Sequence, residues 1–108
     1  MFEVIFGSRS MEKVLFYLYA KKKGYAREIA LFYDTDLTPV QNQLNKLEQG
    51  GVLISRQVGK TRVFEFNLRY PFLKELKSLI RKGIEFLPES EREKLTIYRK
   101  RPRRKGKP

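Results

Sequence analysis

Residues 36–51 carry the most regular pattern of apolar and polar positions in the chain. The apolar residues recur three or four positions apart, which predicts a helix over about residues 37–49 with one narrow buried stripe, made of Val40, Leu44 and Leu47. Asp36 or Thr38 can cap its start with a side-chain oxygen. One residue of the glycine pair that follows can take the left-handed conformation that ends a helix.

The opposite side of this helix is rich in amides, whereas an ordinary solvated face is rich in Glu and Lys. The polar positions there are Thr38, Gln41, Asn42, Asn45, Lys46 and Gln49. Amides both donate and accept hydrogen bonds, and they can pair bidentately with adenine in the major groove of DNA. For this stretch alone, a solvated helix that happens to be rich in amides is an equally good interpretation, so the rest of the chain must decide.

Two further helices precede this one. After a short apolar segment at residues 1–7, apolar spacing predicts a helix over residues 8–22, closed by a lysine run and by Gly24 as its C-terminal glycine. Residues 25–33 predict a second short helix, and residues 34–36 predict a turn. The second short helix, the turn and the amide-faced helix together form a helix-turn-helix, in which the later helix enters the major groove.

The period of the pattern changes from 3.6 to 2 after the glycine pair. Residues 52–58 and 61–68 predict two strands, joined by a Gly-Lys hairpin turn at residues 59–60. One face of this hairpin should close the core with Leu53, Phe64 and Phe66. The cations expected to cluster near its tip are Arg56, Lys60 and Arg62.

In this order, the motifs resemble those of winged helix-turn-helix transcriptional regulators, most of all the ArsR-type group. The resemblance covers roughly residues 2–87 and rests on Arg27-Glu28-Ile29-Ala30, on Val40, Leu44, Leu47-Glu48 and Gly51-Val52, and on Gly59-Lys60-Thr61-Arg62 with Phe64. It implies an α+β, mainly α fold, a winged helix-turn-helix with a three-helix core and a β-hairpin wing. In this chain an additional C-terminal helix and a basic tail follow.

The same resemblance implies a function, because members of the group are dimeric repressors or activators that bind DNA. It implies that bases or phosphates are contacted by Thr38, Gln41, Asn42, Asn45 and Lys46, and that the wing at residues 56–62 contacts the DNA backbone through Lys60 and Arg62. Metal-sensing members use Cys and His ligands. This chain has neither residue, so we expect no metal site and no cofactor.

The last long predicted helix, residues 71–87, has apolar side chains close to a seven-residue repeat. These side chains can pack on the protomer's own core or form the seam of a homodimer, and we expect a mixture of the two. The candidates for the seam are Phe72, Leu76, Leu79, Ile80 and Ile84. Gly83 would weaken a helix by about 1 kcal/mol relative to Ala, which indicates a close approach or a break. We expect one domain over residues 1–88 and a flexible, polar extension over residues 89–108.

Charge favours an acidic partner. The net charge is +12, and the segment 98–108 carries seven Lys or Arg residues and no acid, which leaves +5 on residues 1–97. Such a balance is typical of chains that bind nucleic acid or an anionic membrane. A basic arm of this kind can lie along phosphates, and its candidate DNA contacts are Arg99, Arg101, Arg103 and Arg104.

An enzyme is not expected, because the chain has no His or Cys for general-base or nucleophilic chemistry. No stretch approaches the roughly 20 apolar residues of a membrane span, and no signal peptide is visible, so we expect a cytoplasmic location. The sequence therefore predicts a homodimeric regulator that binds specific sites in double-stranded DNA. A winged-helix module that binds protein or RNA is the alternative, and salt-dependent, sequence-selective binding to duplex DNA separates the two.

Overall fold

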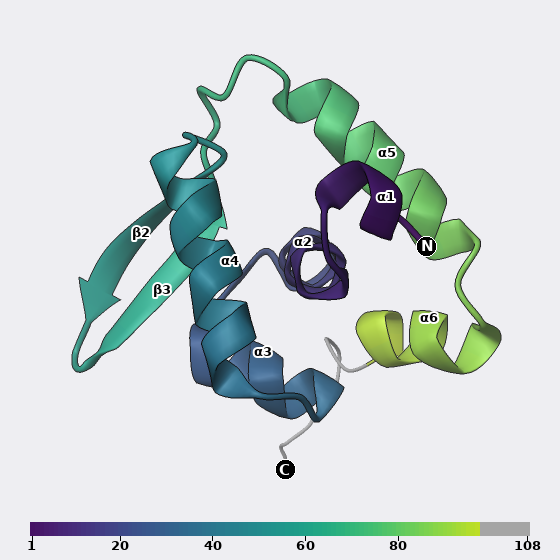
Figure 1. Ribbon diagram of the computed structural model, residues 1–108, viewed down its shortest axis with the longest axis horizontal. Helices are drawn as coiled ribbons and strands as arrows, with labels where there is room; N and C mark the ends of the chain where they lie inside the picture. Colours follow the sequence, from purple (N-terminus) through teal and green to yellow (C-terminus); the bar gives the residue numbers. More distant parts are fainter. Residues whose placement is uncertain (98–108) are drawn as a thin grey trace, which may run out of the picture.

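The computed structural model of the chain describes residues 1–97. The elements follow in the order α1 (Glu3–Phe6), α2 (Arg9–Lys21), β1 (Lys23–Gly24), α3 (Ala26–Tyr33), α4 (Leu37–Gln49), β2 (Leu53–Val58), β3 (Thr61–Phe66), α5 (Leu73–Glu85) and α6 (Glu89–Ile97). Helix α2 runs through the centre of the molecule (Figure 1). Helices α3 and α4 and the β2–β3 hairpin lie on one side of it, and α1 and α5 lie on the other (Figure 1).

The core forms around α2, because five consecutive residues in the middle of this helix, residues 14–18, are buried, and together they cover more than one full turn. Its inward side chains pack against α3, α4, the sheet, α5 and α6. The core that these elements form together includes Val14, Leu15, Leu18, Ile29, Val40, Leu44, Leu53, Phe64, Phe66, Ile80 and Leu95. The predicted stripe of α4 and the predicted core face of the hairpin are therefore both confirmed.

Helix α4 has the predicted body and begins at the earlier of the two predicted positions, although the Asp36 side chain makes no capping hydrogen bond. Asp36 is the N-cap residue, so Thr38 lies inside the first turn and the capping box predicted at Thr38 is wrong. Pro39 also lies in the first turn, where backbone N–H groups have no partner within the helix, so the helix loses no hydrogen bond there. At the other end, Gly51 takes φ +82°, as predicted for the end of the helix.

The prediction for Gly24 is wrong, because this glycine does not end a helix. Helix α2 stops at Lys21, and Gly24 lies in the short strand β1, paired with Phe64 of β3. The sheet therefore has three antiparallel strands in the order β1-β3-β2. A Cβ at Gly24 would lie 2.7 Å from Cε1 of the buried Tyr17, so close packing requires the absence of a side chain here.

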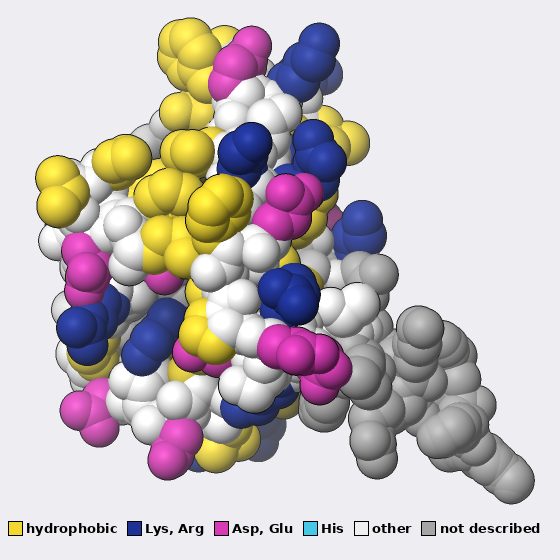
Figure 2. All heavy atoms as spheres, turned by 90° about the vertical axis from the view of Figure 1, so that its right-hand side faces the viewer, with side chains coloured by type: hydrophobic (Ala, Val, Ile, Leu, Met, Phe, Trp, Pro, Cys, Tyr) yellow, Lys and Arg dark blue, Asp and Glu magenta, His cyan; other side chains and the backbone are white. Residues whose placement is uncertain are grey.

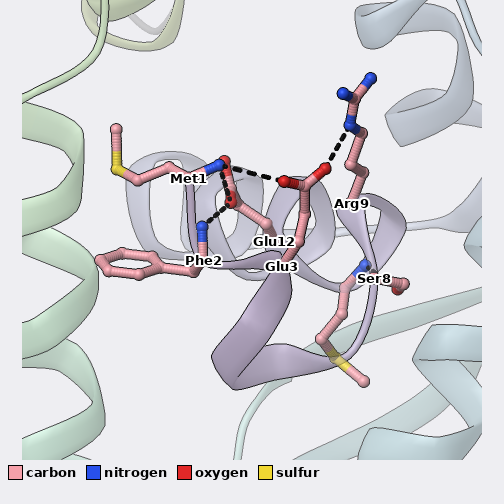
Figure 3. A network of polar contacts seen from close by, with 7 residues as sticks. Met1, Phe2, Glu3, Ser8, Arg9 and Glu12 are labelled. Atoms are coloured by element: carbon pink, nitrogen blue, oxygen red, sulfur yellow. Dashed lines mark hydrogen bonds and ion pairs between the residues drawn. The ribbon is translucent and has the colours of Figure 1, made fainter.

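Helix α1 is held to α2 by a network of polar contacts (Figure 3). The backbone N–H of Phe2 donates to Oε1 of Glu12 at 2.5 Å, and the amino group of Met1 lies 3.2 Å from the same oxygen. Arg9 donates to Glu3, and this hydrogen bond lowers the pKa of the Glu3 carboxyl. These contacts fix a helix that the sequence pattern did not predict.

Gly83 explains how α1 packs against α5. A Cβ at this buried position would lie 2.4 Å from Cε2 of Phe2 and 3.0 Å from Cζ of Phe16. The close approach predicted at Gly83 is confirmed, and the helix continues through it without a break.

The predicted domain boundary at residue 88 is wrong, because α6 packs on the domain. Leu95 is only 3% exposed. Nζ of Lys21 donates to the carbonyl oxygen of Leu95 at 2.8 Å, and Nζ of Lys94 donates to that of Phe32 at 2.5 Å. The folded unit thus includes residues 89–97, whereas the predicted DNA contacts Arg99, Arg101, Arg103 and Arg104 lie outside the described residues.

Within residues 1–97, none of the helices combines the length and the apolar character that crossing a membrane requires.

We predict that Gly24→Ala lowers the free energy of unfolding by about 1–3 kcal/mol, since the new methyl group would overlap the ring of Tyr17. Urea denaturation measures this loss. Gly50→Ala is the matched control, because a Cβ there would meet its nearest atom at an ordinary 3.5 Å, and its effect should stay within about 0.5 kcal/mol. Equal stability of the two variants would contradict the packing account of Gly24.

Candidate functional site

The outward face of α4 is polar and exposed to solvent. The predicted positions Thr38, Gln41, Asn42, Asn45 and Lys46 are all exposed, together with Gln49. Within residues 1–97, the amides of Gln41, Asn42 and Asn45 have no hydrogen-bond partner in the protein. These amides can still donate and accept hydrogen bonds. This face can therefore bind a partner whose surface presents hydrogen-bond donors and acceptors.

The one acidic residue of α4, Glu48, is turned toward the hairpin and away from this face. Ser55 Oγ donates a hydrogen bond to Oε2 of Glu48 at 2.6 Å, and it accepts one from Nη1 of Arg62 at 2.8 Å. This chain of contacts joins α4 to both strands of the hairpin. It holds the hairpin beside the polar face of α4 and turns the one carboxylate of this helix away from that face.

The hairpin register divides the predicted cluster of wing cations. Residues paired across an antiparallel ladder share a face, and Gln57 pairs with Arg62, two positions from Ser55. Arg62 therefore lies on the side of the sheet that faces α4, and Lys60 is exposed in the turn. Arg56 alternates to the opposite face. There its Nη1 lies 2.8 Å from Oε2 of Glu65, so the prediction that it joins the other two is wrong.

A second surface, here called the α1/α5 patch, is apolar. Its exposed members are Val4 at 97%, Phe86 at 70% and Ile5 at 65%, with Met1 and Phe72 also exposed and Leu79 partly exposed. Figure 2 shows hydrophobic side chains gathered on this side of the molecule. The sequence missed the contribution of α1, whose only signal was the apolar run at residues 2–6.

The predicted seam residues of α5 and its N-cap separate into three groups. Ile80 is 0% exposed in the single chain, so its side chain belongs to the core and has no surface left for a partner. Leu76 and Ile84 are partly buried against that core. Phe72 is 63% exposed, and Leu79 is partly exposed and is not among the side chains packed against the core, so a second copy could cover these two.

Tyr33 is the most strongly perturbed titratable side chain among the described residues. Its hydroxyl is buried without a hydrogen-bond partner there, and burial raises its pKa. The ring packs edge-on against Phe32 with a centroid distance of 4.9 Å. At neutral pH the phenol stays protonated, which fits a packing residue of α3.

Residues 1–97 contain no group of three or more His, Cys, Asp or Glu side chains that could hold a metal ion. Two surfaces carry predicted site residues that the structure leaves exposed. They are the polar face of α4 with the wing, and the α1/α5 patch.

Comparison with known proteins gives structural similarity alone. The chain matches no family model and no curated protein sequence. It is similar to the crystal structure of the YusO protein from Bacillus subtilis, with a TM-score of 0.56 and 21% identity over 78% of this chain and 65% of YusO. It is also similar to a mutant of ZitR from Lactococcus lactis in its apo form, with a TM-score of 0.50 and 18% identity over 77% of this chain and 72% of ZitR.

The chain spans slightly less than two thirds of the length of YusO, and at such identities the similarity concerns the fold. The helix order, the α3-turn-α4 pair and the hairpin that follows agree with it. The chain therefore has a winged-helix fold, α+β and mainly helical.

Proposed function

We propose that the chain is a transcription regulator that binds specific sites in double-stranded DNA, with α4 in the major groove. The observation that carries this proposal is the outward face of α4, where unpartnered amides stand together without an acidic residue. In a winged helix, this is the helix that follows the turn of the helix-turn-helix pair. Asn and Gln are the side chains that pair bidentately with adenine, which gives this face a chemistry for base recognition.

The charge supports nucleic acid as the partner. The chain carries +12, Arg62 lies on the sheet face toward α4, and Lys60 is exposed in the turn of the wing. Cations placed beside a recognition helix contact phosphates and fix its register on the duplex. The basic segment 98–108 adds affinity without sequence preference in this proposal. The closer resemblance to ArsR-type regulators rests on the sequence motifs and stays a prediction.

We further propose that the protein binds DNA as a homodimer through the α1/α5 patch. A single α4 reads only a few base pairs, and a two-fold pair reads two half-sites about one helical turn, roughly 34–36 Å, apart. Val4, Ile5, Leu79 and Phe86 form an apolar surface that water would otherwise contact, which favours self-association. The operator should therefore be a pseudo-palindrome.

The first test concerns base readout. Asn42→Ala and Asn45→Ala should each weaken binding to the preferred duplex by about 1–3 kcal/mol and change binding to random DNA little, because a lost base contact affects specific binding alone. Fluorescence anisotropy with both duplexes measures the two affinities. Ser90→Ala, at an exposed position of α6, is the control. Parallel losses on both duplexes would remove these amides from base readout, and tighter binding to RNA would favour the RNA-binding alternative.

The second test compares the two wing arginines, which differ in the sheet face they occupy. Arg62→Gln should reduce the slope of log affinity against log salt by about 0.9, as expected for one lost phosphate contact. Arg56→Gln should leave the slope unchanged, because Arg56 lies on the far face and pairs with Glu65. Salt titration of DNA affinity measures both slopes. A loss for Arg56→Gln alone would show that the opposite face of the wing meets DNA.

The third test concerns the dimer. Leu79→Glu or Phe86→Glu would place a charge in the apolar seam, a penalty of several kcal/mol unless the two protomers separate. Each variant should sediment as a monomer at roughly micromolar concentration and lose affinity for the paired half-sites. Ser78→Glu adds the same charge at a neighbouring exposed position and should remain dimeric. A wild-type chain that sediments as a monomer while protecting one asymmetric site would contradict the dimer.

A further inference from the structure

An open groove of about 790 Å³ lies between the sheet, the C-terminal end of α2, and helices α5 and α6. Helix α4 contributes no residue to it. Ile54 and Glu65 line the groove, and strand alternation puts both on the sheet face opposite Ser55, the residue that bonds to α4. The groove is therefore separate from the polar face of α4, and the proposed DNA contacts do not use it.

The inner surface of the groove is apolar. Leu18, Phe66 and Leu95 line it with side chains that are nearly fully buried, and Ile84 adds a partly buried one. Leu68 also lines it, although this side chain is 82% exposed. Leu68 and Ile54, which is 45% exposed, supply the hydrocarbon surface that the fold leaves in contact with water, and an apolar body placed in the groove would cover it.

The polar lining of the groove is mostly cationic. Four side chains carry positive charge there, namely Lys22, Lys74, Lys77 and Arg81. Among the described residues that line the groove, Glu65 is the only acid, and it is already paired with Arg56 at 2.8 Å. The four cations therefore leave a local excess of positive charge beside the apolar surface.

The contacts of two of these cations, Lys77 and Arg81, show what each could offer a ligand. Nζ of Lys77 lies 5.5 Å from the centroid of the Phe66 ring, which places an ammonium group directly against the apolar lining. Arg81 has only a solvent-exposed contact of 3.9 Å with Glu85, one helical turn away. Exposed pairs of this kind hold a side chain weakly, so Arg81 stays available to another anion.

Lys22 adds an independent observation, because its backbone is strained. It takes φ +81° at the end of α2, a conformation that glycine adopts freely and that other residues rarely adopt. Residues held in such conformations concentrate at functional sites. Glycine at this position would relieve the strain, whereas lysine adds a cation to the lining of the groove.

We propose that this groove binds a small amphipathic organic acid, with its hydrocarbon body on the apolar lining and its carboxylate among the lysines. The volume lies within the roughly 300–1,000 Å³ of small-molecule sites. The combination of a concave apolar lining with surplus cations matches an anion that has a hydrophobic body. Inorganic phosphate would leave the apolar lining uncovered, and a neutral lipid would leave the cations unpaired. Binding at this site requires neither DNA nor a second protomer.

Decanoate is a suitable probe, because it joins a carboxylate to a hydrocarbon chain and stays monomeric at millimolar concentration. Titration into the full chain, followed by calorimetry and by methyl resonances in NMR spectra, should show saturable binding that shifts Ile54, Leu68 and Ile84. Decanol, which lacks the charge, and acetate, which lacks the chain, should each bind roughly tenfold more weakly or worse.

Two sets of variants separate the groove from general charge. Lys74→Gln with Lys77→Gln should weaken decanoate binding by roughly tenfold or more, whereas Arg27→Gln with Lys82→Gln removes the same charge outside the groove and should have little effect. Lys22→Gly should also weaken binding while leaving the melting temperature unchanged or higher, since it removes the strained backbone. This pattern cannot arise from loss of folding.

Four outcomes would overturn the proposal. The first is the absence of saturable decanoate binding. The second is equal affinity for decanol, which would reduce the groove to an apolar crevice. The third is a set of shifts confined to the α1/α5 patch. The fourth is saturation of the groove resonances by an acidic peptide but not by decanoate, which would assign the groove to a protein partner.

Discussion

Burial of α2 on all sides is the constraint on which the remaining structure depends. The helix presents apolar side chains toward α4, the sheet, α5 and α6, so each of those elements has to turn its own apolar stripe inward. For α4, that stripe is Val40, Leu44 and Leu47, and each fully buried side chain contributes about 1.5–3 kcal/mol. Rotating α4 by half a turn would expose all three and bury unpaired amides, so packing alone fixes which face meets the outside.

The same central helix keeps three surfaces apart. Helix α4 and the β2–β3 hairpin lie on one side of α2, and α1 and α5, which carry the α1/α5 patch, lie on the other (Figure 1). The cationic groove forms where the sheet, α5 and α6 meet the end of α2. The three proposed partners, duplex DNA, a second protomer and a small organic acid, would thus bind at separate sites. The hydrogen bonds from Ser55 to Glu48 and from Arg62 to Ser55 join α4 and the hairpin into one unit.

The sequence predicted the elements whose pattern is local, and it missed the features set by distant contacts. The stripe of α4, the hairpin and the glycine at position 83 could all be predicted from spacing and turn chemistry. Gly24 could not, because its role depends on a ring of α2 and on a strand forty residues away in sequence. Helix α6 was also missed as part of the core, since it carries little apolar periodicity and Leu95 supplies its buried contact. The sequence alone could have predicted that Arg56 and Arg62 lie on opposite faces of the hairpin, because a two-residue turn fixes the strand register and hence the face of each residue.

The proposal that α4 contacts bases in duplex DNA can be tested by selecting bound duplexes from a random pool. We expect enrichment of one inverted repeat whose half-sites lie about one helical turn apart, with adenine at the positions that the amides contact. Asn42→Ala and Asn45→Ala should select a degenerate base at those positions. A pool that remains random after repeated rounds, with binding set by salt alone, would contradict it.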